Sequence, residues 1–216
     1  MIIVLLGAPG VGKGSYAKYL KHDLGIPHIS TGEFLRQAIS RGDELGNRVR
    51  EYVTTGELVP DDIMERVVRE RVKQGDAKNG FILDGYPRTL NQAKSLDTIL
   101  EEDGKRVDFI INMVLDEEEI VRRLSSRRQC PECGAIYNML SNPPRENKYC
   151  KRCGAEVIRR PDDAPETIRK RLAIYEKNAQ PVVDYYKHRP GYIEMNTSLS
   201  MEEGTEYLLR RIRNGN

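Results

Sequence analysis

A glycine-rich segment near the start of the chain has the spacing of a phosphate-binding loop. Gly7, Gly12 and Lys13 fit G-x-x-x-x-G-K, directly after an apolar run and before a helical pattern. In such a loop the backbone N–H groups and the helix N-terminus attract a phosphate, and the lysine reaches the terminal phosphates of a nucleotide. The sequence therefore predicts a site for a nucleoside triphosphate.

The residue after this lysine departs from the motif. Gly14 stands where serine or threonine is usual, and the hydroxyl is displaced to Ser15. We therefore expect phosphates, water and a nearby acid to hold Mg2+. Asp84 is the candidate acid, because it ends an apolar run and would emerge at the carboxyl edge of a strand beside the loop. The alternative is that Asp84 only forms a turn or caps a helix.

Four cysteines form a second group of residues with a chemical pattern. Their spacing is C-x2-C, sixteen residues, then C-x2-C, which is typical of a structural zinc site. Four thiolates complete a tetrahedron, so no position remains open for catalysis. Two disulfides are the alternative, and iron could occupy the same ligands. The expected metal ligands are Cys130, Cys133, Cys150 and Cys153.

Arginines are concentrated around the cysteines. Ten of them lie between Arg122 and Arg171, although the whole chain has a net charge of only +2. The guanidinium group suits bidentate contacts with phosphate, whereas a charge run can also be a solvated face. The small net charge gives no general reason to expect binding to nucleic acid or to an anionic membrane.

The arrangement of apolar runs predicts the elements that position these groups. Strands alternate with helical patterns, which indicates a parallel sheet with right-handed crossovers. With 216 residues, we expect one α/β fold with insertions. The fold class is a five-stranded parallel sheet of the P-loop NTPase type with helices on both faces. The expected strands span residues 1–6, 26–30, 80–85, 106–115 and 191–196.

Two helical regions carry further predictions. Residues 31–74 contain two or three helical patterns with no strand between them, which indicates a helical insertion. In the last of these, Ile63, Val67 and Val68 form one apolar stripe, and Asp61 is expected to cap the N-terminus. Residues 164–189 predict one long helix that is perturbed at Pro181.

Five motifs together resemble those of the adenylate kinase family. They are "GAPGVGKGS", "ISTGEFLR", "GELVPDD", "GFILDGYPRTLNQA" and "RRPDDAPETIRKRL", in the family's order and spacing, and they extend from Met1 to about Leu172. The resemblance implies a phosphotransferase that moves the terminal phosphoryl group of Mg-ATP to AMP, reversibly and in line, giving two ADP. It also implies a core of residues 1–29, 60–125 and 164–216, an AMP-binding insertion at 30–59, and a zinc-containing lid at 126–163.

The resemblance assigns roles to individual residues. It implies that ATP is bound by Gly10, Val11, Gly12, Lys13, Gly14, Ser15, Arg123, Arg127, Ile136 and Tyr137. It implies that AMP is bound by Thr31, Arg36, Glu57, Leu58, Val59, Gly85, Tyr86, Pro87, Arg88, Gln92, Arg160 and Arg171. The catalytic residues are expected to be Lys13, Asp84, Arg88, Arg123, Arg127, Arg160 and Arg171.

Within this set, the resemblance gives particular tasks to several side chains. Arg123 is expected to stack on the ATP adenine, with Ile136 and Tyr137 lining the same pocket. Gln92 offers an acceptor and donors to the AMP adenine. Asp162 and Asp163 are expected to orient the arginines when the lid closes; alternatively, they are an acidic cluster at a helix N-terminus.

Other functions remain as alternatives. A zinc ribbon that binds nucleic acid would need aromatic side chains near the cysteines, where only Tyr137 and Tyr149 occur. A GTPase would need N-K-x-D, which "NKYC" does not match, and a kinase for UMP or CMP would share the fold. The longest apolar run, residues 1–6, is too short to cross a membrane. We expect a cytoplasmic enzyme that binds ATP and AMP or ADP and has no nucleic-acid or membrane partner. We expect it to be a monomer, with an oligomer as the alternative.

Overall fold

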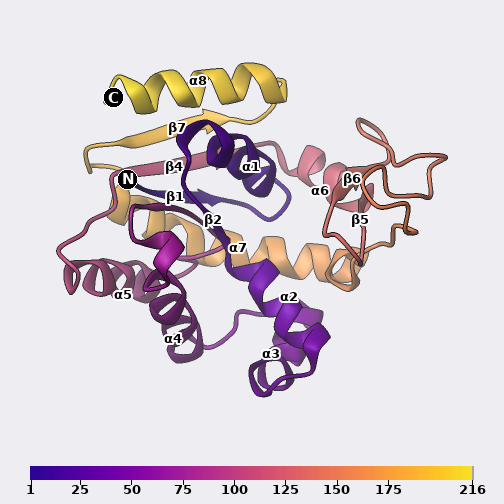
Figure 1. Cartoon of the computed structure of the whole chain (residues 1–216), viewed down its shortest axis with the longest axis horizontal. Coiled ribbons are helices and arrows are strands. Elements are labelled where there is room, and N and C mark those ends of the chain that lie inside the picture. Colours follow the sequence, from indigo (N-terminus) through magenta and orange to yellow (C-terminus); the bar gives the residue numbers. More distant parts are fainter. Residues whose placement is uncertain (216) are drawn as a thin grey trace.

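A parallel sheet of five strands forms the centre of the computed structural model, which describes residues 1–215 (Figure 1). The strand order is β2-β3-β1-β4-β7, and every neighbouring pair is parallel. This confirms the predicted sheet, although the strand expected at 106–115 begins only at Phe109. The strands are β1 (Ile2–Gly7), β2 (His28–Ser30), β3 (Phe81–Asp84), β4 (Phe109–Val114) and β7 (Tyr192–Asn196).

Helices cover both faces of the sheet, as predicted. Successive side chains of a strand point to opposite faces, so Ile2, Val4 and Leu6 of β1 enter one apolar core, and Ile3 and Leu5 enter the other. The first core is closed mainly by α4, α5 and α7, and the second by α1 and α8. Their bounds are α1 (Lys13–Leu24), α4 (Asp61–Val72), α5 (Leu90–Glu101), α7 (Pro165–Tyr186) and α8 (Met201–Arg213).

Three consecutive helices separate β2 from β3, with no strand between them. They are α2 (Thr31–Arg41), α3 (Glu44–Thr55) and α4, and in Figure 1 α2 and α3 project away from the sheet. Gly46 of α3 lies against the backbone carbonyl of Ala38 in α2, and a Cβ at this position would collide with it. The glycine therefore lets the two helices approach closely.

The predicted role of Asp61 as a helix cap is wrong. The apolar stripe of α4 is buried as expected, but the helix begins at Asp61 itself and its N-cap residue is Pro60, which forms no side-chain cap. The carboxylate of Asp61 instead accepts hydrogen bonds from Thr89 and Gln92 at the start of α5. Packing of α4 against α5 brings these donors close, and no local sequence pattern indicates that contact.

The cysteine segment forms a small separate unit, which is inserted in the chain between α6 (Glu117–Ser125) and α7. It contains the antiparallel pair β5 (Arg127–Gln129) and β6 (Ile136–Asn138), followed by isolated bridges and the short 3-10 helix Pro161–Asp163. Another short 3-10 helix, Gly75–Ala77, precedes β3. The core of the cysteine segment consists of Cys130, Ala135, Tyr137, Cys150 and Val157. Because this core is small, the segment has little apolar burial to stabilise it.

The long helix α7 is continuous through Pro181, so the expected perturbation does not break it. A proline inside a helix leaves the carbonyl four residues earlier, that of Lys177, without its helical donor. Pro181 and Lys177 are both exposed, so water can solvate that carbonyl. None of the described helices is both long enough and apolar enough to span a bilayer.

Candidate functional site

The glycine-rich loop connects β1 to the first turn of α1. Gly12 has a φ of 116°, which a residue with a side chain rarely adopts, and the helix begins at Lys13. The ammonium group of Lys13 turns back over the loop and donates to the carbonyl oxygens of Gly7 and Ala8, at 2.6 and 2.8 Å. The loop is therefore formed around the lysine, with the N-terminus of α1 directed into the site.

A cavity of about 980 Å³ opens above this loop. It is lined by the loop, by the carboxyl ends of the strands and by residues of the cysteine segment and α7. A neighbouring cavity of about 60 Å³ lies between α2, α3 and α4 and shares Gly85 and Arg88 with the first. The two cavities therefore meet beside the loop.

The structure places most of the expected site residues on these cavities. Those on the larger one are Gly10, Gly12, Lys13, Gly14, Ser15, Arg36, Leu58, Asp84, Gly85, Pro87, Arg88, Arg123, Arg127, Ile136, Tyr137, Arg160 and Arg171. Those on the smaller one are Thr31, Arg36, Glu57, Leu58, Val59, Gly85, Arg88, Gln92 and Arg171. Val11 and Tyr86 line neither, because their side chains are packed in the core.

Asp84 ends β3 and lies close to the loop. A Cβ at Gly14 would be 3.5 Å from its carboxylate, and Nε2 of His28 lies 3.4 Å from Oδ2. That distance is long for a hydrogen bond, and Nε2 has no other partner within the described residues. Burial opposes ionisation of Asp84, but the His28 contact and the charge of Lys13 outweigh it, so the pKa of Asp84 is lowered. The site thus holds an ionised carboxylate next to the phosphate position.

Lys13 is placed among other positive charges. Burial lowers its pKa to about 8; Asp84 opposes this change, whereas Arg88, Arg171 and Arg127 add to it. These arginines come from distant parts of the sequence and line the same cavity as Lys13. Such a cluster of donors suits a group that carries several negative charges.

The arginines are held by two buried aspartates. Arg160 forms a bidentate pair with Asp162, at 2.9 and 2.6 Å, and Arg171 donates to the same carboxylate at 3.1 Å. Nε of Arg127 donates to Asp163, which is completely buried, at 2.7 Å. Burial disfavours the Asp162 carboxylate, but Arg160 and Arg171 outweigh it and lower its pKa strongly. The aspartates therefore orient arginines, as expected, rather than only capping a helix.

Arg36 faces the smaller cavity and has no comparable partner. Its nearest acid is Asp162, with 3.9 Å between Nη1 and Oδ2, and its Nε is buried without a hydrogen bond within the described part of the chain. Burial, together with the charge of Arg160, lowers the pKa of Arg36 to about 9. An anion in this cavity would supply the acceptor that this guanidinium lacks.

Arg123 is fixed in one plane by three acceptors. Its Nε donates to Glu119 at 3.1 Å, and its Nη groups donate to the carbonyl oxygens of Val11 and Thr197 at 3.3 and 2.8 Å. The Thr197 hydroxyl also donates to the Val11 carbonyl, at 2.8 Å. A guanidinium held in this way presents a rigid face on which an aromatic ring can stack.

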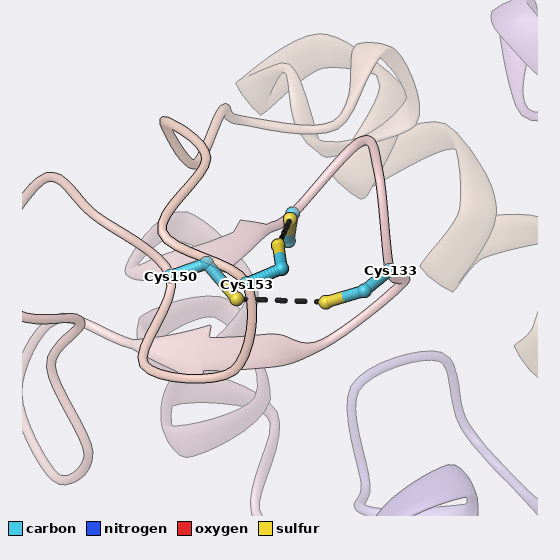
Figure 2. A group of neighbouring side chains, drawn as sticks. Cys133, Cys150 and Cys153 are labelled. Atoms are coloured by element: carbon cyan, nitrogen blue, oxygen red, sulfur yellow. Dashed lines mark hydrogen bonds between the residues drawn. The ribbon is translucent and has the colours of Figure 1, made fainter.

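The four cysteine sulfurs point toward one another, and Figure 2 shows Cys133, Cys150 and Cys153 turned into the same space. All four Sγ atoms lie within 4.8 Å of each other, and none forms a disulfide. The Cys130–Cys153 and Cys133–Cys150 pairs are 3.4 and 3.5 Å apart. In a tetrahedral zinc site with Zn–S bonds of about 2.3 Å, neighbouring sulfurs are about 3.8 Å apart. The donor set therefore fits a structural metal ion, and the disulfide alternative does not hold.

The side chain of Tyr137 belongs to the core of this metal-binding segment. Its hydroxyl lies 3.2 Å from the Cys150 sulfur and accepts a hydrogen bond from the Lys151 amide at 2.8 Å. A ring buried in this way cannot stack on the bases of a nucleic acid, which weakens the zinc-ribbon alternative. Tyr137 also lines the larger cavity.

Sequence reasoning missed three groups at the site. His28 lies beside Asp84, although only its strand was considered. The segment that contains Thr197, Leu199 and Met201 lines the larger cavity. Asp61 accepts a hydrogen bond from Nε2 of Gln92 at 2.6 Å. The segment that follows β7 could have been found by asking what lies at the carboxyl end of that strand, where ligands bind in parallel sheets. His28 begins β2, and its place beside Asp84 follows only from the pairing of β2 with β3. Asp61 required the packing of α4 on α5.

Comparisons with known proteins identify the family of the chain. The family model for adenylate kinase matches residues 5–190 of the chain. The adenylate kinase of Archaeoglobus fulgidus is 48% identical over 189 residues, which are 88% of this chain and 87% of the relative. The adenylate kinase of Thermosipho africanus is 45% identical over 213 residues, which are 99% of this chain and 100% of the relative. This chain belongs to the adenylate kinase family.

Proposed function

We propose that the chain transfers the terminal phosphoryl group of Mg-ATP directly to AMP and forms two ADP in a reversible reaction. The observation that carries this proposal is the meeting of two cavities at Arg36, Arg88 and Arg171, with Lys13 on the larger one. Two anionic nucleotides placed end to end there would have their phosphates within reach of one set of cations. Their alignment would replace a bimolecular encounter by a reaction between positioned groups.

The donor nucleotide is assigned to the larger cavity. The loop from Gly10 to Ser15 would bind the donor phosphates through backbone N–H groups and the Lys13 ammonium. The fixed plane of Arg123 would stack on the base, and Arg127 would contact the phosphates. The rigid orientation of Arg123 supports this assignment, since no conformational freedom is lost on binding.

The acceptor is assigned to the smaller cavity. Arg36 and Arg88 would bind its phosphate, with Thr31 and the backbone from Glu57 to Val59 around the nucleoside and Gln92 at the base. Arg160 and Arg171 would lie between the two nucleotides and stabilise charge on the transferred group. No nucleophile with a partnered base stands out among these residues, so direct in-line transfer without a covalent intermediate is proposed.

Magnesium would be held by the phosphates, water and Asp84. The protein offers one ionised carboxylate at this point, and the ion commonly retains several waters when phosphates supply the other ligands. When bound, Mg2+ would neutralise charge that develops on the phosphates. The residues next to it keep separate tasks, because Lys13 and the loop amides position the donor whether or not Asp84 is charged.

Residues 126–163 are proposed to act as a lid stabilised by zinc on Cys130, Cys133, Cys150 and Cys153. Zinc would supply folding free energy that the small core of this segment does not. Closure would carry Arg127 and Arg160 to the phosphates and exclude water, so that AMP and not water receives the phosphoryl group. The division into core, AMP-binding insertion at 30–59 and lid, and a monomeric cytoplasmic enzyme, stay predictions.

The test is ADP formation by the purified protein with magnesium and ATP, compared for AMP, GMP, UMP, CMP and no acceptor. Fast ADP formation with AMP alone supports the proposal. Preference for a pyrimidine acceptor would contradict the assignment of AMP, and equal rates without any acceptor would indicate an ATPase. Inversion of configuration at the transferred phosphorus is expected for a single in-line step, whereas retention would exclude it.

A further inference from the structure

A closed set of hydrogen bonds joins the start of α4 to the start of α5. The two oxygens of Asp61 accept from Nε2 of Gln92 at 2.6 Å and from the Thr89 hydroxyl at 3.1 Å. Oε1 of Gln92 accepts from the backbone N–H of Arg88 at 2.8 Å, and its own backbone N–H donates to the Thr89 oxygen at 3.1 Å. The Gln92 amide is therefore held on both sides.

The partners of this amide cannot exchange their roles. A carboxylate only accepts hydrogen bonds, and a backbone N–H only donates them. If the amide turned over, its oxygen would face the Asp61 carboxylate and its NH2 group would face the Arg88 N–H. Both contacts would be repulsive in a site where Gln92 is 2% exposed, so Asp61 and Arg88 enforce one orientation.

The fixed amide presents a directional pattern to the smaller cavity. Gln92 lines this cavity together with the apolar side chains of Leu58, Val59 and Met64. With one hydrogen of Nε2 and one lone pair of Oε1 already used, one donor and one acceptor remain. A 6-aminopurine offers the complementary donor at C6 and acceptor at N1, whereas a 6-oxopurine offers the reverse pattern.

We propose that Asp61 is a specificity-determining residue, which makes the acceptor site select 6-amino over 6-oxo purine nucleotides by locking the orientation of the Gln92 amide. The inference deepens the proposed function and rests on it, because it takes the base of the acceptor to lie at Gln92. Asp61 itself acts through Gln92 and need not touch the nucleotide. An amide free to turn over would accept either class of purine.

Asp61→Asn is the decisive variant, because it keeps the shape of the side chain and removes its acceptor-only character. An asparagine can present its NH2 group to Oε1 of Gln92, so the turned amide regains one partner although it still loses the Arg88 N–H. Asp62→Asn is the matched control. Asp62 lies in the same helical turn and is exposed, and its side chain forms no hydrogen bond or ion pair within the described residues.

The measurement is kcat/KM for AMP and for IMP, with saturating Mg-ATP, in the wild-type chain and both variants. IMP differs from AMP only at C6 and N1, so it isolates the pattern read by the amide. We expect Asp61→Asn to raise the ratio of IMP to AMP by roughly tenfold, as for loss of a hydrogen bond to a charged group. The ratio in Asp62→Asn and the KM for ATP in all three proteins should not change.

An unchanged ratio in a folded Asp61→Asn protein that is active with AMP would overturn the proposal. A wild-type chain without activity on AMP would instead overturn the proposed function, and the inference with it. If Asp61→Asn does not fold, Thr89→Val removes the donor that fixes the carboxylate and retains Asp61. That variant should raise the IMP to AMP ratio in the same direction by a smaller factor, and an unchanged ratio would again refute the inference.

Discussion

Lys13 must carry a charge to bind phosphates, yet the free site disfavours that charge. Burial lowers its pKa to about 8, and the charges of Arg88, Arg171 and Arg127 oppose protonation further. Bound phosphates would add negative charge and raise the pKa again. The free protein and the complex should therefore respond differently to pH.

We predict that kcat/KM for ATP falls as the pH rises through about 8, because the ammonium of Lys13 is lost in the free protein. The decline should approach roughly tenfold per pH unit, the limit for one ionisation. The profile of kcat should stay flat to higher pH, because the phosphates hold the proton on Lys13. A kcat/KM profile that is level to pH 10 would contradict the environment described for Lys13.

Replacement of Arg88 by alanine should lower kcat by roughly 100-fold or more, because the residue is proposed to bind the acceptor phosphate and align it for in-line attack. The exposed Arg66 of α4, changed to alanine, is the matched control and should retain wild-type turnover. Thermal midpoints measured on both variants separate a loss of fold from a loss of chemistry. A turnover close to wild type in Arg88→Ala would remove Arg88 from the proposed catalytic set.

The sequence predicted the residues that lie within local motifs and missed those that act across elements. Gly12, Lys13 and Asp84 could be found because a loop, a helix start and a strand end are local patterns. His28 and Asp61 could not, since their importance comes from neighbours in other elements. Side-chain partners across a sheet or between helices depend on packing, which one sequence does not display.

At the level of elements, the two cysteine turns are nearly the same structure. In "CPECGA" and "CKRCGA" the backbone carbonyl oxygen of the first cysteine accepts a hydrogen bond from the backbone N–H of the glycine. The distance is 3.1 Å from Gly134 to Cys130 and 2.9 Å from Gly154 to Cys150. Both glycines have a positive φ, 69° and 80°, which lets each turn fold back under its thiolates. The repeat was available in the sequence, and it explains how two short loops present four sulfurs to one point.

Replacing Cys130 and Cys133 together by serine should lower the thermal midpoint by at least ~5 °C, since the lid would lose its metal and has little core of its own. Turnover at moderate temperature should change far less. Glu132→Gln, between the two cysteines, keeps every thiolate and serves as the control. Metal analysis should give one zinc per wild-type chain, and an unchanged midpoint in the double variant would refute a stabilising role.

Across the whole molecule, the site collects like charges from every part of the chain. Arg36 comes from α2, Arg160 precedes the short helix before α7, and Arg171 lies in α7, with Lys13 at the start of α1. Burial and mutual repulsion lower the pKa of Arg36 to about 9 and that of Arg171 to about 10. Asp162 and Asp163 compensate only part of this charge. In the free protein the cationic side chains therefore still repel one another, and a bound polyanion would reduce that repulsion.

This arrangement predicts that a polyanion stabilises the folded molecule without any nucleoside. Millimolar tripolyphosphate should raise the thermal midpoint by several degrees, as expected for a ligand that binds the native state alone, whereas sodium chloride at equal ionic strength should not. The low concentration avoids general salt effects on apolar burial, because these require far more salt. In Arg36→Gln the repulsion is smaller and one contact is lost, so the shift should shrink. Equal shifts with tripolyphosphate and chloride would mean that the cations do not form one anion-binding centre, and the proposed meeting of two nucleotides at that centre would lose its electrostatic basis.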